Sequence, residues 1–229
     1  MQRWSVVVPA KGLTGAKTRL GTPGPRHEDL VLALLGDTLE AVAACPAVAD
    51  LWVVTDDPRA AAVATGIGAG VVGGAPAGLN AALAQGAAAV RAAAVRAAAA
   101  VDPAAAVGAA VRTVHGARTD VRIAALHSDL PALRPAELAE ALGRAGAVPR
   151  SFVADAEGTG TVLLAVTAGE LAPSFGPGSA AAHAASGAVP LVGDWPGLRR
   201  DVDTPAHLAQ ALDLGCGPRT TGRAPRACA

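Results

Sequence analysis

The chain has 229 residues, enough for one sizeable α/β domain, and its 19 basic and 19 acidic residues give a formal net charge of zero. This balance argues against a general nucleic-acid binder or a protein of anionic membrane surfaces, because both classes carry an excess of basic residues. Hydrophobic residues make up 52% of the chain but aromatic residues only 2%, so the core must be packed from Val, Leu and Ala.

Cysteine usage and the start of the chain indicate a cytosolic protein. Cys45, Cys216 and Cys228 are scattered and lack the spacing of metal ligands, so neither a disulfide framework nor a structural zinc site is expected. A strand-like run begins within four residues of the N-terminus, without the apolar stretch of a signal peptide, and charged residues and Pro interrupt the Ala-rich stretches. We therefore expect no membrane segment.

Strand-like and helix-like runs alternate along the chain, which predicts an α/β fold with a mostly parallel central sheet flanked by helices. Strands are expected at residues 4–8, 51–55, 70–72, 121–126, 151–154, 161–166 and 189–192. Helices are expected at residues 29–44 and 58–64, from Gly78 onward, and at 135–145, 179–185 and 205–214, the last with Thr204 as N-cap. Residues 1–214 would form one domain, with 87–119 an Ala-rich helix extension and surface loop, and 215–229 a flexible tail.

The first predicted strand leads into a cationic loop that contains Lys11, Lys17 and Arg19 together with Gly12 and Gly15. Ligands of open α/β sheets bind at the carboxyl ends of strands, which is where this loop lies. Several cations and unobstructed backbone N–H groups favour contact with a phosphate group. The alternative is an ordinary solvated surface loop.

Two acidic segments point to a divalent metal. Asp129 directly follows an apolar strand, and Asp201 and Asp203 occupy alternate positions of an extended segment, so their side chains point to the same side. Carboxylate oxygens of this kind suit Mg²⁺ held jointly with substrate phosphates. The alternatives are a turn cap for Asp129 and a favourable charge at the start of the last helix for Asp203; we favour the latter for Asp203 but not for Asp201.

A third group of residues lies on two glycine-rich turns, at 158–161 and at 175–179 before a short predicted helix. Hydroxyl groups and backbone N–H groups at such a place can bind an anion without formal charge, although a pair of ordinary tight turns is the alternative. Ser179 and His183 lie four residues apart without an orienting acid, which argues against a hydrolytic nucleophile and base.

Together these motifs resemble the CofC/FbiD family of guanylyltransferases, which act on 2-phospho-L-lactate or phosphoenolpyruvate. The resemblance spans nearly the whole chain and rests on Val8-Pro9-Ala10-Lys11, Ala16-Lys17-Thr18-Arg19-Leu20, Thr55-Asp56-Asp57, Gly78-Leu79-Asn80, Asp129-Leu130-Pro131, Gly158-Thr159-Gly160-Thr161, Phe175-Gly176-Pro177-Gly178-Ser179 and Arg200-Asp201-Val202-Asp203-Thr204-Pro205. It implies a single-domain nucleotidyltransferase fold of the glycosyltransferase-A type. His127-Ser128 stands where relatives often carry small or apolar residues.

The resemblance implies transfer of GMP from GTP to phosphoenolpyruvate, with release of pyrophosphate, in the biosynthesis of coenzyme F420; 2-phospho-L-lactate is the near alternative acceptor. By similarity, Asp129 and Asp201 would bind Mg²⁺, and Thr161, Gly176 and Ser179 would hold phosphoenolpyruvate. Lys11, Lys17 and Arg19 would face the GTP phosphates, and Gly78 and Asn80 would lie near the nucleoside. Direct hand-off of the product to the next transferase and a homodimer are further options.

Two other function classes stay open. A sugar-phosphate or molybdopterin-type nucleotidyltransferase should show a first loop richer in glycine than this one. A non-catalytic nucleotide-binding regulator is the second alternative, and the presence of both Asp129 and Asp201 counts against it, since a sensor need not keep two metal ligands.

Overall fold

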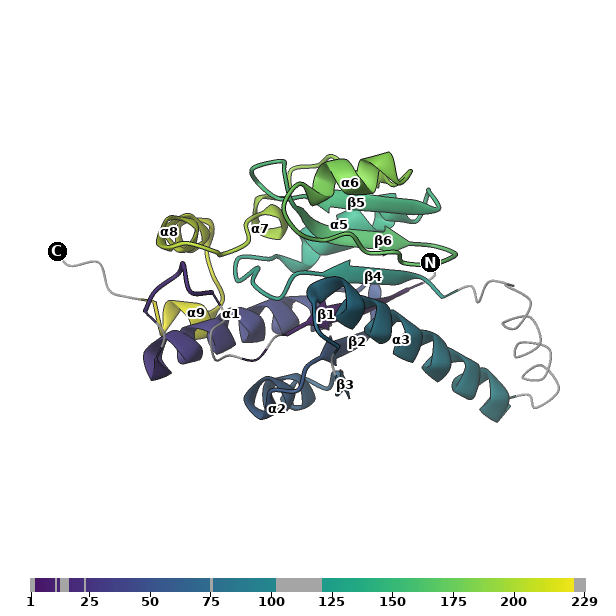
Figure 1. The fold of residues 1–229 in the computed structure, drawn as a ribbon, viewed down its shortest axis with the longest axis horizontal. Coiled ribbons are helices and arrows are strands. Elements are labelled where there is room, and N and C mark those ends of the chain that lie inside the picture. The colour runs from purple at the N-terminus through teal and green to yellow at the C-terminus, as the bar shows by residue number, and fades with distance from the viewer. Residues whose placement is uncertain are drawn as a thin grey trace.

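A computed structural model describes residues 3–10, 12, 17–22, 24–74, 76–101 and 121–224 (Figure 1). Its centre is one seven-stranded sheet with the strand order β3-β2-β1-β4-β6-β5-β7. The strands are β1 (Trp4–Pro9), β2 (Val48–Val54), β3 (Gly70–Val72), β4 (Ile123–Leu126), β5 (Arg150–Ala154), β6 (Thr161–Val166) and β7 (Val189–Pro190).

The sheet is mostly parallel, as predicted. β1 pairs in parallel with β2 and β4, β2 with β3, and β5 with β7. Strand β6 is the exception, because it runs antiparallel between β4 and β5. The amino end of β6 therefore lies at the same edge of the sheet as the carboxyl ends of β1, β4 and β5.

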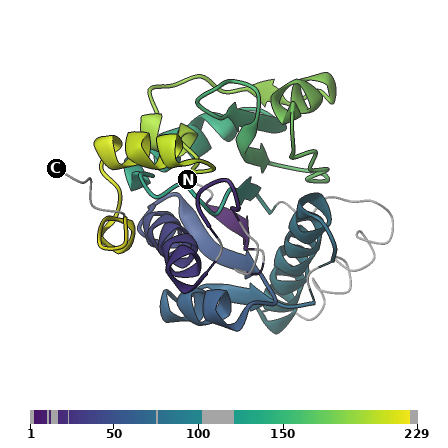
Figure 2. The same cartoon turned by 60° about the vertical axis from the view of Figure 1, so that its left-hand side comes forward.

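Helices cover both faces of the sheet, because its strands are apolar on both sides. Val6 and Val8 of β1 point into one buried cluster and Val7 into the other. The first cluster includes residues of α1 (Pro25–Ala43), α2 (Pro58–Gly66) and α5 (Pro135–Ala145); the second includes residues of α3 (Leu79–Val101) and α6 (Ser179–Ala185). Figure 2 shows α1 and α3 on opposite sides of the sheet.

Local chemistry explains where three helices begin; the starts at Pro58 and Pro205 confirm the prediction, and the start of α1 differs from it. The side chain of Thr204 accepts a hydrogen bond from the N–H of His207 and caps α8 (Pro205–Leu214), as expected. Helix α2 is capped by Asp57, whose carboxylate accepts the N–H groups of Arg59 and Ala60. Helix α1 begins at Pro25 rather than at residue 29, with the proline in its first turn, where a missing N–H costs nothing.

The last part of the chain differs from the prediction. The expected strand at 189–192 is only Val189–Pro190, and two short helices, α7 (Pro196–Arg199) and α9 (Pro218–Thr221), were not predicted. Helix α9 docks on α1, where the carboxylate of Asp37 accepts the N–H of Arg219 at 3.1 Å and of Thr220 at 2.7 Å. Residues 215–224, which were expected to belong to a flexible tail, thus include a helix that is hydrogen-bonded to α1. Residues 102–120 and 225–229 lie outside the described part.

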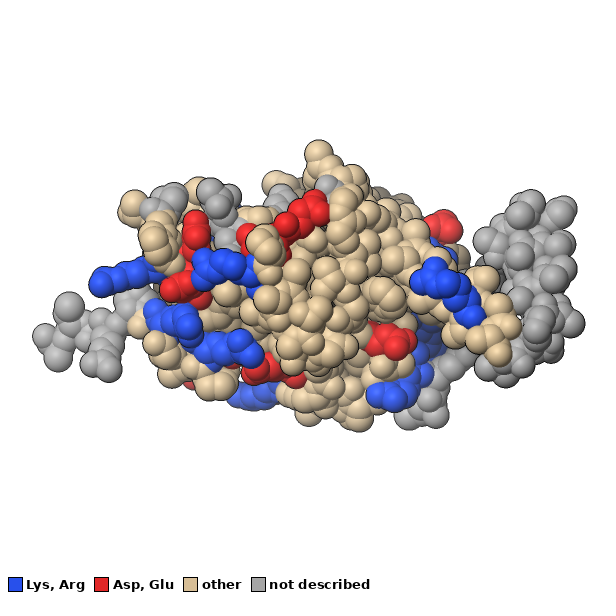
Figure 3. Space-filling view, turned by 90° about the horizontal axis from the view of Figure 1, so that it is seen from below, with Lys and Arg blue, Asp and Glu red and all other residues tan. Residues whose placement is uncertain are grey.

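Charge on the face shown in Figure 3 is mixed, with acidic and basic side chains interspersed around a broad uncharged area. Charged side chains also form local pairs, such as Arg59 with Glu28 at 3.4 Å and Arg144 with Glu140 at 2.6 Å. Among the described residues, no helix combines the length and the apolar composition needed to cross a membrane.

Candidate active site

A cavity of about 400 Å³ opens at the edge of the sheet where β4 and β5 end and β6 begins. The antiparallel pairing of β6 with β4 continues past the strand end, since the N–H of His127 donates to the carbonyl of Val162 at 3.0 Å. This pairing brings the start of β6 beside the segment that follows β4. Five of the predicted site residues line the cavity: Arg19, Thr161, Gly176, Ser179 and Asp201. A second hollow of about 490 Å³ is lined by none of the predicted site residues.

The two acidic segments lie side by side because backbone hydrogen bonds join them. The N–H of Val202 donates to the carbonyl of Asp129 at 3.1 Å. The next residue, Leu130, donates its N–H to the hydroxyl of Thr38 on α1 at 2.9 Å. Both Leu130 and Val202 are fully buried, so apolar packing holds the two segments in place.

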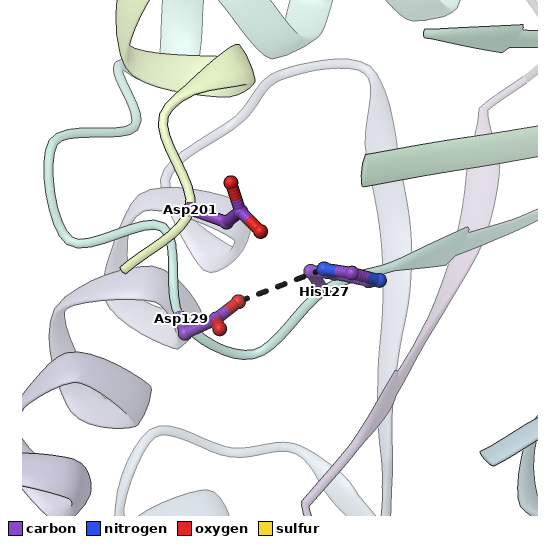
Figure 4. Close-up of side chains that lie close together, drawn as sticks. All are labelled: His127, Asp129 and Asp201. Atoms are coloured by element: carbon purple, nitrogen blue, oxygen red, sulfur yellow. Dashed lines mark ion pairs between the residues drawn. The ribbon is translucent and has the colours of Figure 1, made fainter. Parts of the chain in front are cut away.

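Figure 4 shows the side chains that this arrangement brings together, with Asp129 and Asp201 facing each other beside the ring of His127. One ligand atom from each of the three residues lies within 4.8 Å of the other two. His127 Nε2, Asp129 Oδ1 and Asp201 Oδ1 are buried, and none has a hydrogen-bond partner among the described residues. Unpartnered buried oxygen atoms are costly, and a divalent cation between these side chains would satisfy them.

The pKa values of these side chains follow from burial and neighbouring charge. Burial raises the pKa of Asp201, and the charge of Asp203 raises it further. Burial, and then the charge of Lys17, lowers the pKa of His127 to about 4. The imidazole of His127 is thus neutral at physiological pH, which is the form that binds metal ions.

Lys17 lies against the carboxylates instead of pointing into open space. Its ammonium group binds the carboxylate of Asp129 and also that of Asp203, the latter at 2.5 Å. Arg19 lies 3.5 Å from Asp203. Burial is the largest single influence and would raise the pKa of Asp203, but the charge and the hydrogen bond of Lys17, together with the charge of Arg19, outweigh it, and the pKa falls. The carboxylate of Asp203 therefore pairs with Lys17, whereas the sequence favoured a role at the start of α8.

The two glycine-rich turns form one structural unit on the other side of the cavity. The carboxylate of Asp155 accepts the N–H groups of Thr159 at 2.9 Å and Gly160 at 2.8 Å, and a Cβ at Gly160 would collide with it. Ala180 donates its N–H to the carbonyl of Thr159 at 3.1 Å, which ties one turn to the other. Gly176 has φ 138° and is the point where the second turn needs glycine.

The donors of this second turn differ from the expectation. The N–H of Ser179 donates to the carbonyl of Gly176 at 3.1 Å, and the N–H of Ala180 donates to the carbonyl of Thr159. These two backbone groups are therefore not free for an anion. The hydroxyl-bearing residues that line the cavity on this side are Ser179 of the second turn and Thr159 and Thr161 of the first turn.

Known proteins are similar to this chain in sequence and in fold. No family model matches the chain. A phosphoenolpyruvate guanylyltransferase of Geodermatophilus obscurus is 51% identical over 96% of this chain and 93% of its own length. Proteins of the same name from Salinispora arenicola and Streptomyces coelicolor are 52% and 48% identical, over 96% and 98% of this chain and 92% and 97% of their own lengths.

The chain belongs to the phosphoenolpyruvate guanylyltransferase family. The resemblance inferred from the motifs is thereby confirmed. Two solved structures support the fold alone. A Methanothermobacter nucleotidyl transferase superposes with a TM-score of 0.56 at 19% identity, over 93% of this chain and 97% of that one. A candidate nucleotide-diphospho-sugar transferase from Desulfovibrio desulfuricans G20 superposes with a TM-score of 0.55 at 15% identity, over the same shares.

Within this member of the phosphoenolpyruvate guanylyltransferase family, Asn80 makes contacts that the sequence did not suggest. Its side-chain N–H donates to the carbonyl of Phe175 at 3.0 Å, and its oxygen accepts the N–H of Phe175 at 2.7 Å. The amide therefore holds the turn that contains Gly176. Contact of Gly78 and Asn80 with a nucleoside stays a prediction, and Lys11 lies outside the described residues.

Sequence reasoning named two histidines, His127 and His183, but assigned neither of them a role at this site. His127 lies two residues before Asp129, the same spacing that singled out Asp201 and Asp203, so the alternation rule could have found it. His183 of α6 is buried and contacts the hydroxyl of Thr161, at 2.9 Å from Nδ1 to Oγ1. Its two ring nitrogens bond to Thr161 and Ser174 and not to Ser179, in agreement with the view that Ser179 and His183 are not a nucleophile and base.

Proposed function

We propose that this protein transfers GMP from GTP to phosphoenolpyruvate. A phosphate oxygen of the acid attacks the α-phosphorus of GTP, the bond from that phosphorus to the oxygen that bridges to the β-phosphate breaks, and pyrophosphate leaves. One observation carries the proposal. Buried oxygens of Asp129 and Asp201 have no hydrogen-bond partner among the described residues, and Asp201 lines the same cavity as the hydroxyl-bearing residues Thr161 and Ser179. Family membership at about half identity agrees with it.

Asp129 and Asp201 would hold Mg²⁺, with the neutral imidazole of His127 as a third ligand. The ion would supply positive charge to neutralise the reacting phosphates. Carboxylates are the preferred ligands of Mg²⁺, and an imidazole nitrogen suits Mn²⁺ better, so assays should include both ions.

Positively charged residues would bind the triphosphate of GTP. Lys17 carries its charge directly beside Asp129 and Asp203, and the side chain of Arg19 is 76% exposed and lines the cavity. Together with Lys11 they would stabilise the charge that develops on departing pyrophosphate. Gly78 and Asn80 would lie near the nucleoside. Catalysis of this kind depends on alignment and charge, so no covalent nucleophile is needed.

The acceptor acid would be bound by Thr161, Gly176 and Ser179, which form the proposed acceptor side of the cavity. The hydroxyl groups donate hydrogen bonds to the carboxylate or phosphate oxygens of the acid, and Gly176 allows the close turn that brings them together. The names of the relatives favour phosphoenolpyruvate over 2-phospho-L-lactate. The protein would work in the cytoplasm, where GTP and phosphoenolpyruvate are available, and would pass its product to the next transferase.

The test is pyrophosphate release by the purified protein with GTP, Mg²⁺ or Mn²⁺, and one acid at a time: phosphoenolpyruvate, 2-phospho-L-lactate or 3-phosphoglycerate. We expect release with phosphoenolpyruvate, little with 3-phosphoglycerate, and a strong preference for GTP over CTP. An Asp129→Asn variant serves as the inactive control. Because the product may decompose or remain bound, a parallel reaction includes the transferase that would consume it. Silence with every acid in both formats would overturn the proposal.

A further inference from the structure

His183 is a buried side chain for which the reaction as described has no use. It lies on α6, is fully buried, and makes two hydrogen bonds. Its Nδ1 lies 2.9 Å from Oγ1 of Thr161, and its Nε2 lies 3.0 Å from the backbone nitrogen of Ser174. The rings of Phe175 and Phe152 lie 5.2 Å and 5.9 Å from it, centroid to centroid, and fix its plane.

These contacts decide which ring nitrogen carries the proton. A backbone N–H can only donate, so Nε2 of His183 must accept from Ser174 and cannot be protonated. Burial, and then the charge of Arg150, lowers the pKa of His183 to about 4, so the ring is neutral at physiological pH. Its single proton therefore sits on Nδ1 and is donated to the oxygen of Thr161.

The direction of this bond determines what the Thr161 hydroxyl can do. A hydroxyl has one proton to give, and here its oxygen already accepts a hydrogen bond from His183. Among the described residues, the hydroxyl of Thr161 has no second hydrogen-bond partner, and Thr161 lines the cavity. Its own proton is thus left for an acceptor atom in the cavity.

We propose that His183 is a positioning residue that holds Thr161 as a hydrogen-bond donor, so that this part of the cavity selects an anionic oxygen of the acceptor acid over a donor group. The inference rests on the proposed function in one respect, namely that Thr161 contacts the acceptor. A carboxylate or a phosphate oxygen fits this requirement, because both accept and do not donate when ionised.

The chain offers a matched pair of variants at this position. In His183→Gln the amide reaches the place of Nε2, so the bond to Ser174 can persist while the donor to Thr161 is lost. In His183→Asn the amide lies near the place of Nδ1, so the donor to Thr161 can persist while the bond to Ser174 is lost. A merely structural histidine would make the two variants alike.

Steady-state kinetics of the full chain with GTP and phosphoenolpyruvate distinguish the two roles. We expect His183→Gln to raise KM for the acid about five- to tenfold, the worth of one neutral hydrogen bond, with KM for GTP changed less than about twofold. His183→Asn should keep KM for the acid near the wild-type value. In a Thr161→Val background, His183→Gln should add no further change. Equal effects of Gln and Asn, or additive effects with Thr161→Val, would overturn the inference.

A second measurement does not depend on activity. Two-dimensional ¹H–¹⁵N spectra of the histidine rings should show Nδ1 of His183 protonated and Nε2 unprotonated at pH 7. The opposite tautomer would overturn the inference even in an active enzyme. Conversely, a wild-type protein with this tautomer but without any pyrophosphate release would remove the proposed function and leave the assignment of the Thr161 donor intact.

Discussion

The proposed metal side of the site (His127, Asp129 and Asp201) and the proposed acceptor side (Thr161, Gly176 and Ser179) are built in different ways. The proposed metal side joins residues far apart in the chain, with Lys17, Asp129 and Asp203 in one ionic cluster, and one buried oxygen each of Asp129 and Asp201 has no hydrogen-bond partner among the described residues. On the proposed acceptor side, the carboxylate of Asp155 accepts backbone N–H groups of its own turn, and the hydroxyl of Thr161 is hydrogen-bonded to His183. The proposed metal side would be completed by a cation, whereas the hydrogen bonds that shape the proposed acceptor side are made within the protein.

This difference has an energetic consequence. Burial raises the pKa of Asp201, which means that the folded protein disfavours its ionised form. A carboxyl group whose pKa is higher in the folded protein than in the unfolded chain lowers the stability of the metal-free protein at neutral pH, because the unfolded chain ionises more readily. On the proposed acceptor side, the buried side chains of Thr161 and His183 are hydrogen-bonded to each other, and His183 also accepts the N–H of Ser174, so the same cost does not arise for these two residues.

The largest expected effect comes from Asp201→Asn. Turnover should fall by at least about 10²-fold, because a ligand of the charge-neutralising ion is lost. The metal-free variant should nevertheless unfold at a higher temperature than the wild type at pH 7, since the amide removes a buried charge that folding disfavours. Turnover number and the midpoint of thermal unfolding in chelator measure the two effects.

The matched control for this variant is Asp194→Asn, which changes an exposed carboxylate. It should alter neither quantity. If Asp201→Asn lowered the unfolding midpoint as well as turnover, Asp201 would be a structural residue and the contrast between the two sides would fail.

The pH dependence of stability provides the second test. The unfolded chain binds a proton at His183 below its ordinary pKa of 6.5, whereas the folded protein does so only below about 4. The stability contributed by the neutral ring is thus complete above pH 6.5 and is lost as pH falls towards 4. The shift corresponds to about 3 kcal/mol. His127 has a similarly lowered pKa and contributes in the same direction.

Comparison of the wild type with His183→Asn isolates the share of His183. Urea unfolding between pH 7.5 and 4.5 should show the wild type losing stability faster than the variant as pH falls. Parallel curves would mean that folding does not lower the pKa of His183, and the neutral form of its ring in the folded protein would lose this support.

The third test asks whether Asn80 belongs to the nucleotide side or to the acceptor side. Asn80→Leu removes both hydrogen bonds to the backbone of Phe175 and should loosen the adjoining turn. We expect KM for the acid to rise about tenfold, or about 1.4 kcal/mol, with a smaller change in KM for GTP. The opposite pattern would assign Asn80 to the nucleoside. Gln85→Leu on the same helix is the control, because its amide bonds only to the carbonyls of Gly73 and Gly74.

The sequence predicted most of the sheet and the longer helices because their limits are set locally. Pro135 and Thr204 mark helix starts by their own chemistry, and apolar runs marked the strands. Helices α7 and α9 have only four residues each, too few for a hydrophobic period, and they depend on distant partners. In α7 the N–H of Leu198 donates to Glu137 at 2.7 Å, and in α9 the N–H groups bond to Asp37.

In the candidate site, too, some features could be predicted from local sequence, whereas others depend on contacts between distant segments. The rule that ligands bind at strand ends predicted the position of Asp129, and the family resemblance implied that Asp201 lies near it; the structure brings the two together. Strands at 151–154 and 161–166 were predicted, but not that β6 would run antiparallel to β4 and so place Thr161 beside His127. The pairings of Lys17 with two carboxylates, Asn80 with Phe175, and His183 with Thr161 follow from that arrangement, and no local signal in the sequence encodes them.

The smallest expected effect separates a buried carboxylate that is satisfied from one that is not. Asp37 and Asp201 are both buried, with exposed fractions of 4% and 8%, but Asp37 accepts two backbone N–H groups from α9. Asp37→Asn keeps an oxygen for only one of them, so stability should fall by about 1 kcal/mol, and turnover should not change because α9 lies outside the cavity lining. Urea unfolding of both Asn variants at pH 7 should therefore give changes of opposite sign. A stabilising Asp37→Asn would show that burial of a carboxylate, rather than its lack of partners, governs the behaviour of Asp201.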